Sequence, residues 1–398
     1  MHVDLEDLRF ERGGALLVKR ALRLAAVGEL VTVAGRHPDF AVHLRAWCRA
    51  EGHEFRPAEE SGTGHAQIVR GPAVDQRWRG AERAGRADPQ ESGAVWERPS
   101  RRWGLAPRGA LVEAGSAEFH FALDRKEEVW SGDAARIYAQ AAAAQWDPAT
   151  AVPWGAEFDL PAAVEDAIVQ VMTYLIENET AALVVPSRFV AQMHPHFREV
   201  MQVLAIQAAD EARHIEVFTR RASLKRKELG VSTAGGQASL QTLVDEPDFA
   251  IAAFLLSVLG EGTFLNLLWF LERFAPDPVT SAVCRLAAQD EARHVAFGMS
   301  HLRQHLQATP ALRSTLMNSV RQRHETLRHT AGLNAEVFDA LVLLAAGSWD
   351  RADIGRGHDA VSALVQEMHT GRKRRLLKLG FSDTDAEEMS SLHTRNFM

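Results

Sequence analysis

The sequence contains the pentapeptide Asp-Glu-Ala-Arg-His twice, at 210–214 and again at 290–294, each time inside an alanine-rich, apolar stretch. Residues three positions apart in an α-helix share one face, so Glu211 lies beside His214 and Glu291 lies beside His294. Each copy therefore presents a carboxylate and an imidazole together, and these are the groups that suit iron or manganese.

Two further carboxylates precede these motifs. Glu261 is the acid of the apolar run "FLLSVLGEGTFLNLLWFL", 30 residues before Glu291. A lone buried carboxylate is costly, so Glu261 must be paired, protonated or bound to a metal. In "LIENETAAL", Glu177 and Glu179 stand 34 and 32 residues before Glu211. Aligning "LIEN" with "LGEG" favours Glu177 as the counterpart of Glu261 and leaves Glu179 as the alternative.

The resulting candidate ligand set has four carboxylates and two imidazoles, namely Glu177, Glu211, Glu261, Glu291, His214 and His294. Four negative charges suit two divalent ions rather than one zinc ion. One copy of the motif would fit a charged helix surface equally well. Two copies, each preceded by a glutamate at the spacing of a helical hairpin, favour a dinuclear metal site.

This doubled motif resembles the ferritin-like superfamily of di-iron carboxylate oxygenases and oxidases, which includes arylamine N-oxygenases, hydroxylases and the small subunit of ribonucleotide reductase. The resemblance covers about residues 130–345. It implies a ferritin-like helical bundle holding two iron ions, or a Mn/Fe pair, with O2 as co-substrate. The six candidate ligands would then also be the catalytic residues of a non-haem di-iron oxidoreductase.

The function implied is O2-dependent oxidation of a small organic substrate, in specialised metabolism, with an external electron donor. A ferroxidase or peroxide-consuming protein is the alternative enzyme, and a non-catalytic metal-containing binding protein is the third reading. The C-terminal "LLKLGFSDTDAEEMSSLHTRNFM" also resembles the tail of ferritin-like proteins.

The resemblance also assigns supporting residues. It implies that Asp290 accepts a hydrogen bond from His214, and that Asp210 does so from His294, orienting the metal-bound rings. The alternative is that each aspartate pairs with the arginine three residues later on its own helix. Tyr174, one turn before Glu177, either reaches a ligand carboxylate or is a core residue with a satisfied hydroxyl.

Two positions depart from particular members of the superfamily. Ribonucleotide reductases place a radical tyrosine four residues after the first histidine, where this chain has Phe218, so a tyrosyl radical is not expected. Arylamine N-oxygenases carry an extra histidine one turn before the second motif, where this chain has Ala287. An ordinary six-residue ligand set is therefore expected.

The elements that must position these residues are long helices between about 130 and 345. A helix with a central glutamate is followed by a helix carrying the motif, and this unit occurs at 165–214 and at 249–294. Helices this long and apolar should pack as a bundle. A C-terminal helical extension is expected over 346–398, so the fold class is mainly α.

The N-terminal residues 1–57 alternate strand and helix signals and predict a small β-α-β-α-β module. The segment resembles small sulfur-carrier (TusA-like) domains, but Phe10 stands where those domains carry the catalytic cysteine. A docking role for a protein partner is therefore expected, with Cys48 as a buried core residue. Residues 58–129 predict an irregular connector rich in Trp and Arg.

Composition restricts the remaining choices. The chain has 398 residues, 46% of them hydrophobic, with a net charge of -7, which gives no nucleic-acid signature. Two cysteines, Cys48 and Cys284, do not make a disulfide framework. Without a basic leader or an uninterrupted membrane-length apolar run, we expect a soluble cytoplasmic protein, with a homodimer left open.

Overall fold

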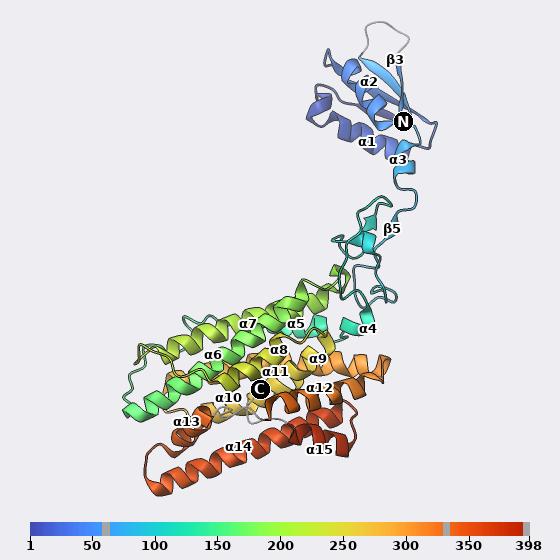
Figure 1. Ribbon diagram of the computed structural model, residues 1–398. Helices are drawn as coiled ribbons and strands as arrows, with labels where there is room; N and C mark the ends of the chain where they lie inside the picture. Colours follow the sequence, from blue (N-terminus) through green and yellow to red (C-terminus); the bar gives the residue numbers. More distant parts are fainter. Residues whose placement is uncertain (58–63, 329–334, 393–398) are drawn as a thin grey trace. The chain divides into compact units, whose positions relative to one another are not determined.

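The computed structural model describes residues 1–57, 64–328 and 335–392. The chain divides into two compact units, one of Met1–Asp88 with Arg101–Phe119 and one of Pro89–Ser100 with His120–Met398 (Figure 1). Three pieces of the expected organisation lie outside the described residues: the start of the connector at 58–63, the end of one predicted helix and its junction with the next at 329–334, and the end of the C-terminal motif at 393–398.

The first unit begins with a four-stranded sheet and its helices: β1 (His2–Asp4), η1 (Phe10–Arg12), α1 (Gly14–Leu24), β2 (Leu30–Ala34), α2 (Phe40–Glu51), β3 (Glu54–Pro57), β4 (His65–Val69) and the short α3 (Ala73–Arg77). The strand order is β1-β2-β4-β3, and only the β1–β2 pair is parallel. The expected β-α-β-α-β order holds through β3. Strand β4 was missed, because just two of its residues, Ala66 and Ile68, are buried and show the period of two.

The core of this unit lies between the sheet and the two longer helices. Val18 of α1, Leu44 and Cys48 of α2, and Val31 and Ile68 of the sheet are all fully buried. Burial raises the pKa of the Cys48 thiol to about 11, so the thiol stays protonated and packs as a small apolar group. Cys48 is thus a core residue, as expected.

A smaller part of the first unit is built on a two-stranded sheet. Its elements are β5 (Glu82–Arg83), η2 (Arg101–Trp103) and β6 (Leu111–Val112). The β5–β6 pair is antiparallel, and Ala84, Trp103 and Val112 form a small core of its own. Trp103 therefore packs inside this part of the unit.

The second unit is a helical bundle. Its elements are α4 (Lys126–Val129), α5 (Ala134–Ala143), α6 (Ala162–Val190), η3 (Pro195–Phe197), α7 (Arg198–Ala222), α8 (Ala234–Val244), α9 (Phe249–Ala253), the π-helical η4 (Phe254–Glu261), α10 (Gly262–Arg273), α11 (Pro278–Ala308), α12 (Leu312–Leu327), α13 (Ala335–Ala346), α14 (Arg351–Lys378) and α15 (Asp383–Ser391). The fold is therefore mainly α, with a small N-terminal sheet module, as the sequence predicted.

The longest helices make the centre of the bundle. Figure 1 shows α6 running beside α7, with α10 and α11 in the next layer and α14 beyond them. Among the described residues, two helical stretches, Ala162–Val190 and Phe249–Arg273, could cross a membrane by length and composition alone. Their most apolar windows are 67% and 83% buried inside the bundle, which is what core helices show.

A buried ion-pair network joins three of these helices. Arg221 of α7 has no exposed surface, and its guanidinium lies 2.7 Å from Glu165 Oε1 of α6 and 2.7 Å from Asp277 Oδ2, the N-cap of α11. Its Nε also donates to Thr280 Oγ1 at 2.8 Å. Because Arg221 lies two turns beyond His214, this network sets the level of α6 and α11 against α7.

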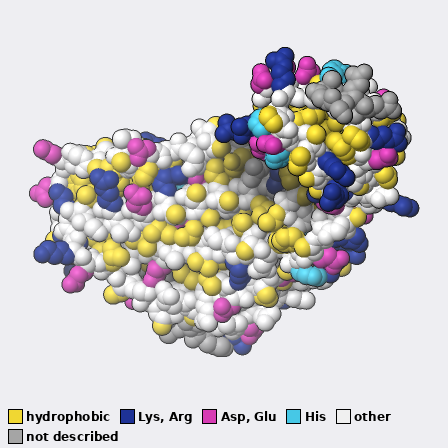
Figure 2. Space-filling view, turned by 90° about the horizontal axis from the view of Figure 1, so that it is seen from above, with side chains coloured by type: hydrophobic (Ala, Val, Ile, Leu, Met, Phe, Trp, Pro, Cys, Tyr) yellow, Lys and Arg dark blue, Asp and Glu magenta, His cyan; other side chains and the backbone are white. Residues whose placement is uncertain are grey.

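The surface of the bundle mixes both signs of charge. Figure 2 shows acidic and basic side chains interspersed on the face in view, with apolar side chains between them. This pattern agrees with a sequence that has 45 Lys and Arg against 52 Asp and Glu.

Candidate metal centre

Six carboxylate and imidazole side chains meet in the interior of the bundle. They come from α6, α7, the last residue of η4, and α11, and they are Glu179, Glu211, His214, Glu261, Glu291 and His294. None is more than 3% exposed. The bundle thus concentrates titratable groups in a place that water does not reach.

Ligand atoms of these residues form two groups, and within each group all atoms lie within 4.8 Å of one another. The first group is Glu179, Glu211, His214 and Glu291. The second group is Glu211, Glu261, Glu291 and His294. Glu211 and Glu291 belong to both groups, so they lie between two positions, and Glu179 and Glu261 are terminal.

Nδ1 of each histidine faces the carboxylates. His214 Nδ1 is 3.2 Å from Glu211 Oε2 and 3.5 Å from Glu179 Oε2. It is also 3.5 Å from Glu291 Oε1. His294 Nδ1 is 3.0 Å from Glu211 Oε1 and 3.4 Å from Glu291 Oε2. Each imidazole therefore completes one of the two groups.

The structure places Glu179 in the cluster and Glu177 outside it, so the preference for Glu177 was wrong. Residues two positions apart on an α-helix point about 200° apart, and only one of the two can face the core. Glu177 is half-buried, and its Oε1 accepts a hydrogen bond of 3.1 Å from Gln237 Nε2 of α8. Matching flanking letters with the second repeat ignored the π-helical turn of η4, which changes the phase there.

Nε2 of each histidine faces an aspartate of the opposite motif. His214 Nε2 lies 3.2 Å from Asp290 Oδ2, and His294 Nε2 lies 3.2 Å from Asp210 Oδ2. These are the crossed pairs that the resemblance implied. Each aspartate also pairs with the arginine three residues later on its own helix, Asp210 with Arg213 and Asp290 with Arg293. In addition, Arg213 lies 2.9 Å from Asp290 Oδ2 of the other helix. The aspartates thus take part in the expected histidine pairs and in the alternative arginine pairs as well.

Two residues just beyond α5 cover these aspartates. Trp146 Nε1 donates to Asp290 Oδ2 at 2.8 Å, and Gln145 Nε2 donates to Asp210 Oδ1 at 2.8 Å. The Arg213 guanidinium lies over the Trp146 ring, 4.6 Å from its centroid. The sequence analysis did not single out this pair. A Gln-Trp at the end of an alanine-rich helix has no chemical signature until its partners are known.

Glu261 is held by its neighbours as well as by its position in η4. Gln207 of α7 is 1% exposed, and its Nε2 donates to Glu261 Oε1 at 2.7 Å. Arg375 Nε of α14 donates to the carbonyl of Val258 at 2.7 Å, inside the π-helical segment. Segments of π-helix are rare and frequent at functional sites. The sequence analysis did not single out Gln207 or Arg375.

The pKa values of the carboxyl groups in the cluster shift in opposite directions. Burial, and then the charge of Glu211, raise the pKa of Glu179 well above its usual range, and burial with Glu291 does the same for Glu261. Burial opposes ionisation of Glu211, but His294 and hydrogen bonds outweigh it and lower that pKa. The carboxyl groups of Glu179 and Glu261 are therefore harder to ionise than usual when no cation is near them.

The imidazoles are shifted the other way. Burial opposes their protonation, but the carboxylates around them outweigh it, so the pKa of His214 and of His294 is raised well above the usual value. The pKa of Asp290 is lowered despite burial, because His214, Arg213 and Trp146 all favour the carboxylate. The carboxylates of the cluster therefore favour a positive charge beside them.

Unsatisfied polar atoms show that the cluster fits metal ions. Buried carboxylate oxygens without a hydrogen-bond partner include Glu179 Oε1, Glu261 Oε2 and Glu291 Oε2. Leaving a buried polar atom unpaired costs about 1–3 kcal/mol each, so three in one place need an explanation. All three belong to the two groups, and carboxylate and imidazole donors are those that iron and manganese take.

The other candidate positions lie in the apolar core. Tyr174 is 4% exposed, and its ring lies 6.4 Å from that of Phe264. Phe218, at the position of a radical tyrosine, is fully buried with its ring 6.2 Å from His214. Ala287 is also fully buried. No redox-active tyrosine therefore stands four residues after the first histidine.

Comparisons with known proteins find similarity among solved structures. No protein-family model matches the sequence, and no curated protein matches it. The R2-like ligand-binding oxidase from Sulfolobus acidocaldarius is 17% identical, with a TM-score of 0.40, and the match covers 59% of this chain and 89% of that one. We base no conclusion on a similarity of this size. The comparisons give no support to the sulfur-carrier resemblance of the N-terminal module.

Proposed function

We propose that the bundle binds two transition-metal ions, preferably iron, and that the protein uses O2 to oxidise a small organic substrate. The observation that carries this proposal is that two ligand groups share Glu211 and Glu291. Two carboxylates shared by both groups, with one further carboxylate and one imidazole on each side, would match the ligand set of ferritin-like dinuclear sites. A Mn/Fe pair fits the same donors.

The ligands we assign are Glu179, Glu211, His214, Glu261, Glu291 and His294. Two ferrous ions in such a site would supply electrons that reduce O2. The surrounding protein determines which molecule is then oxidised. Asp290 and Asp210 orient the two imidazoles through Nε2, so that Nδ1 faces the metal positions. The apolar core around the site excludes water, which keeps the reaction from being diverted.

The proposed reaction requires a substrate and an electron donor from outside the chain. Phe218 cannot store an oxidising equivalent as a tyrosine at that position would, which favours oxidation of an external molecule. We propose a small-molecule substrate and a separate reductant. The N-terminal unit, with a core of its own, is then available to dock a partner.

Anaerobic loading with two ferrous ions per chain, followed by mixing with O2, tests this function. We expect O2 consumption to continue over many turnovers only when a reductant and an oxidisable organic compound are both present. O2 uptake that stops at the amount needed to oxidise the bound iron, whatever compound is added, would instead identify a ferroxidase. A chain that takes up no metal would exclude both the oxidase and the ferroxidase.

The ligand assignment is tested by two glutamates on α6. Glu179→Ala should lower the metal content from two ions to one or none, because it removes a terminal ligand. Glu177→Ala removes a carboxylate that bonds to Gln237 outside the cluster, and it should keep two ions. Metal analysis after iron-supplemented expression measures both. Full metal content in the Glu179 variant with a loss in the Glu177 variant would reverse our assignment.

A further inference from the structure

The two halves of the metal centre differ at one equivalent position. Gln207 stands four residues before Glu211, and Ala287 stands four residues before Glu291. Both side chains are buried and lie one helical turn before their motif, on the face that looks into the cluster. At this position the first copy of the repeat therefore supplies the amide of Gln207, and the second copy supplies only the methyl group of Ala287.

Gln207 anchors one terminal carboxylate. Its Nε2 donates to Glu261 Oε1 at 2.7 Å, whereas Glu261 Oε2 has no hydrogen-bond partner. One oxygen of Glu261 is thus fixed by the protein and the other remains for a metal. This bond is fully buried, so it is not weakened by competing water.

The backbone that carries Glu261 is also anchored. Arg375 Nε donates to the Val258 carbonyl at 2.7 Å, and Thr263 Oγ1 donates to the Leu259 carbonyl at 2.6 Å. A Cβ at Gly262 would lie 2.4 Å from Arg375 Nε, so the glycine lets the guanidinium approach the helix closely. Two neighbouring carbonyls of the π-helical turn are therefore held by side chains, which limits how far Glu261 can shift.

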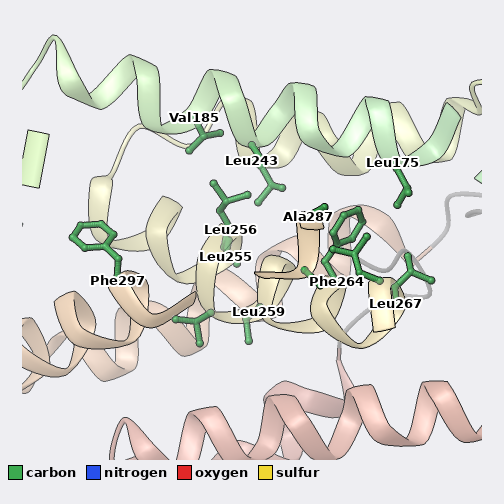
Figure 3. Packing of buried hydrophobic residues seen from close by; sticks show 14 of the residues in the cluster. Leu175, Val185, Leu243, Leu255, Leu256, Leu259, Phe264, Leu267, Ala287 and Phe297 are labelled. Atoms are coloured by element: carbon green, nitrogen blue, oxygen red, sulfur yellow. The ribbon is translucent and has the colours of Figure 1, made fainter. Parts of the chain in front are cut away.

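Glu179 has no anchor of this kind from outside the cluster. Its carboxyl group interacts with two other candidate ligands, Glu211 and His214, whose Nδ1 lies 3.5 Å from Glu179 Oε2. Its Oε1 has no hydrogen-bond partner. Ala287, the counterpart of Gln207, offers no donor and packs in the apolar cluster with Leu175 and Phe264. Figure 3 shows these three side chains gathered at one end of the view.

We propose that Gln207 is a positioning residue that fixes Glu261, and that Glu179 is the terminal carboxylate free to change its binding mode. The metal position beside Glu179 and His214 is then the one that takes an external ligand. The apolar part of that ligand would pack against Ala287. This inference rests on the dinuclear site proposed above and goes beyond it by making the two metal positions unequal. It assigns an apolar substrate group to one side of the site.

Stepwise binding of Mn2+, followed anaerobically by the electron paramagnetic resonance signal of the free ion, tests Gln207. Wild-type protein should bind two ions with clearly different affinities. Gln207→Met keeps the side-chain volume but removes the donor, and it should weaken the tighter ion about 10–100-fold, the usual effect of losing a group that orients a ligand. The weaker ion should be unchanged.

The matched control is Gln237→Met, which removes the same kind of bond from Glu177 outside the cluster. It should bind both ions as the wild type does. Equal affinities in wild type, or a Gln207→Met variant with both affinities unchanged, would overturn the inference while leaving a two-metal site in place. Failure of wild type to bind any ion would instead overturn the proposed function, and the inference with it.

Azide added to the dicobalt protein tests the second part of the proposal, that the Glu179 side takes an external ligand. This experiment leaves Gln207 unchanged. Cobalt absorption bands report the ligand number, and one azide per chain should bind, at the Glu179 side. Ala287→Ser adds a hydrogen-bond donor with little added volume, at the position where Gln207 stands in the other half. If the new hydroxyl holds Glu179 in place, azide binding should weaken several-fold while two metal ions remain bound. Two equivalent azides in wild type, or azide binding unaffected by Ala287→Ser, would contradict the binding of an external ligand at the Glu179 side.

Discussion

Asp290 stands between an imidazole of one helix and an indole beyond another, and this makes it the most connected carboxylate beside the cluster. It lies 3.2 Å from His214 Nε2 and accepts from Trp146 Nε1 at 2.8 Å. Asp290→Asn keeps the size but removes the charge that orients the imidazole. We expect metal affinity to fall about 10–100-fold, measured by anaerobic titration with ferrous iron.

Glu291→Gln is the comparison for that variant, because it changes a carboxylate shared by both ligand groups. It should abolish binding of the second ion, which Asp290→Asn should only weaken. An Asp290 variant that behaves like Glu291→Gln would place Asp290 among the ligands. One that binds iron like wild type would show that the contact with His214 does not orient the ring.

The raised pKa values predict that metal binding releases protons. Glu179, Glu261, His214 and His294 all have pKa values above their usual range, so each holds its proton to a higher pH than usual when no metal is bound. Each must lose its proton to become a ligand, so metal affinity should rise with pH. Calorimetry in buffers of different ionisation enthalpy measures the protons released. Affinity that falls with rising pH would contradict this electrostatic picture.

Residue types and spacing were enough to find most of the cluster. Glu211 with His214, and Glu291 with His294, follow from a spacing of three on a helix, and Glu261 follows from one acid in an apolar run. The choice between Glu177 and Glu179 on α6 could not be made from residue types and spacing. It depends on helical phase, and the π-helical turn that sets the phase in the other repeat leaves no simple letter pattern. Anchors such as Gln207 become recognisable only through their partners.

At the scale of elements, the register of α6, α7 and α11 is set by contacts that lie away from the metal ligands. Arg221 is fully buried between Glu165 and Asp277, and Asp277 also caps α11 by accepting from the Thr280 amide at 2.8 Å. Burial opposes the charge of Arg221, but its two carboxylate partners outweigh it and raise its pKa. The sequence analysis found the helices but not this network, because Glu165 and Asp277 each lie 56 positions from Arg221 in the chain.

Arg221→Ala should strongly destabilise the bundle. Removing the arginine leaves two buried carboxylates without a partner, and breaking a buried pair in this way typically costs about 3–5 kcal/mol. Arg226→Ala is the matched control, because its pair with Asp166 is largely exposed and should contribute less than about 1 kcal/mol. Urea unfolding followed by far-ultraviolet circular dichroism measures both. Similar losses in the two variants would show that the buried network is not what holds the helices.

At the scale of the whole molecule, the two units have separate cores, but the chain passes between them more than once. Residues 89–100 belong to the bundle unit, while 101–119 belong to the first unit. Ala94 and Val95 are buried in the bundle core, and the Trp96 amide donates to His196 Nε2 at 2.9 Å. The sequence predicted one irregular connector here. Without helix or strand periodicity, it gave no sign of which unit each part would join.

Truncation separates the role of this segment from that of the first unit. A chain of residues 89–398 keeps the segment, and it should bind two metal ions as the full chain does, because all six proposed ligands lie in the bundle. A chain of residues 120–398 should also bind two ions but be less stable, by about 3 kcal/mol. It loses the buried Val95 side chain, worth roughly 1.5–3 kcal/mol, and a hydrogen bond to buried His196, worth about 1 kcal/mol. Metal analysis and urea unfolding of both chains measure these effects. Loss of metal from the longer chain would mean that the N-terminal unit helps to form the site, and equal stability of the two would mean that residues 89–100 are not part of the bundle core.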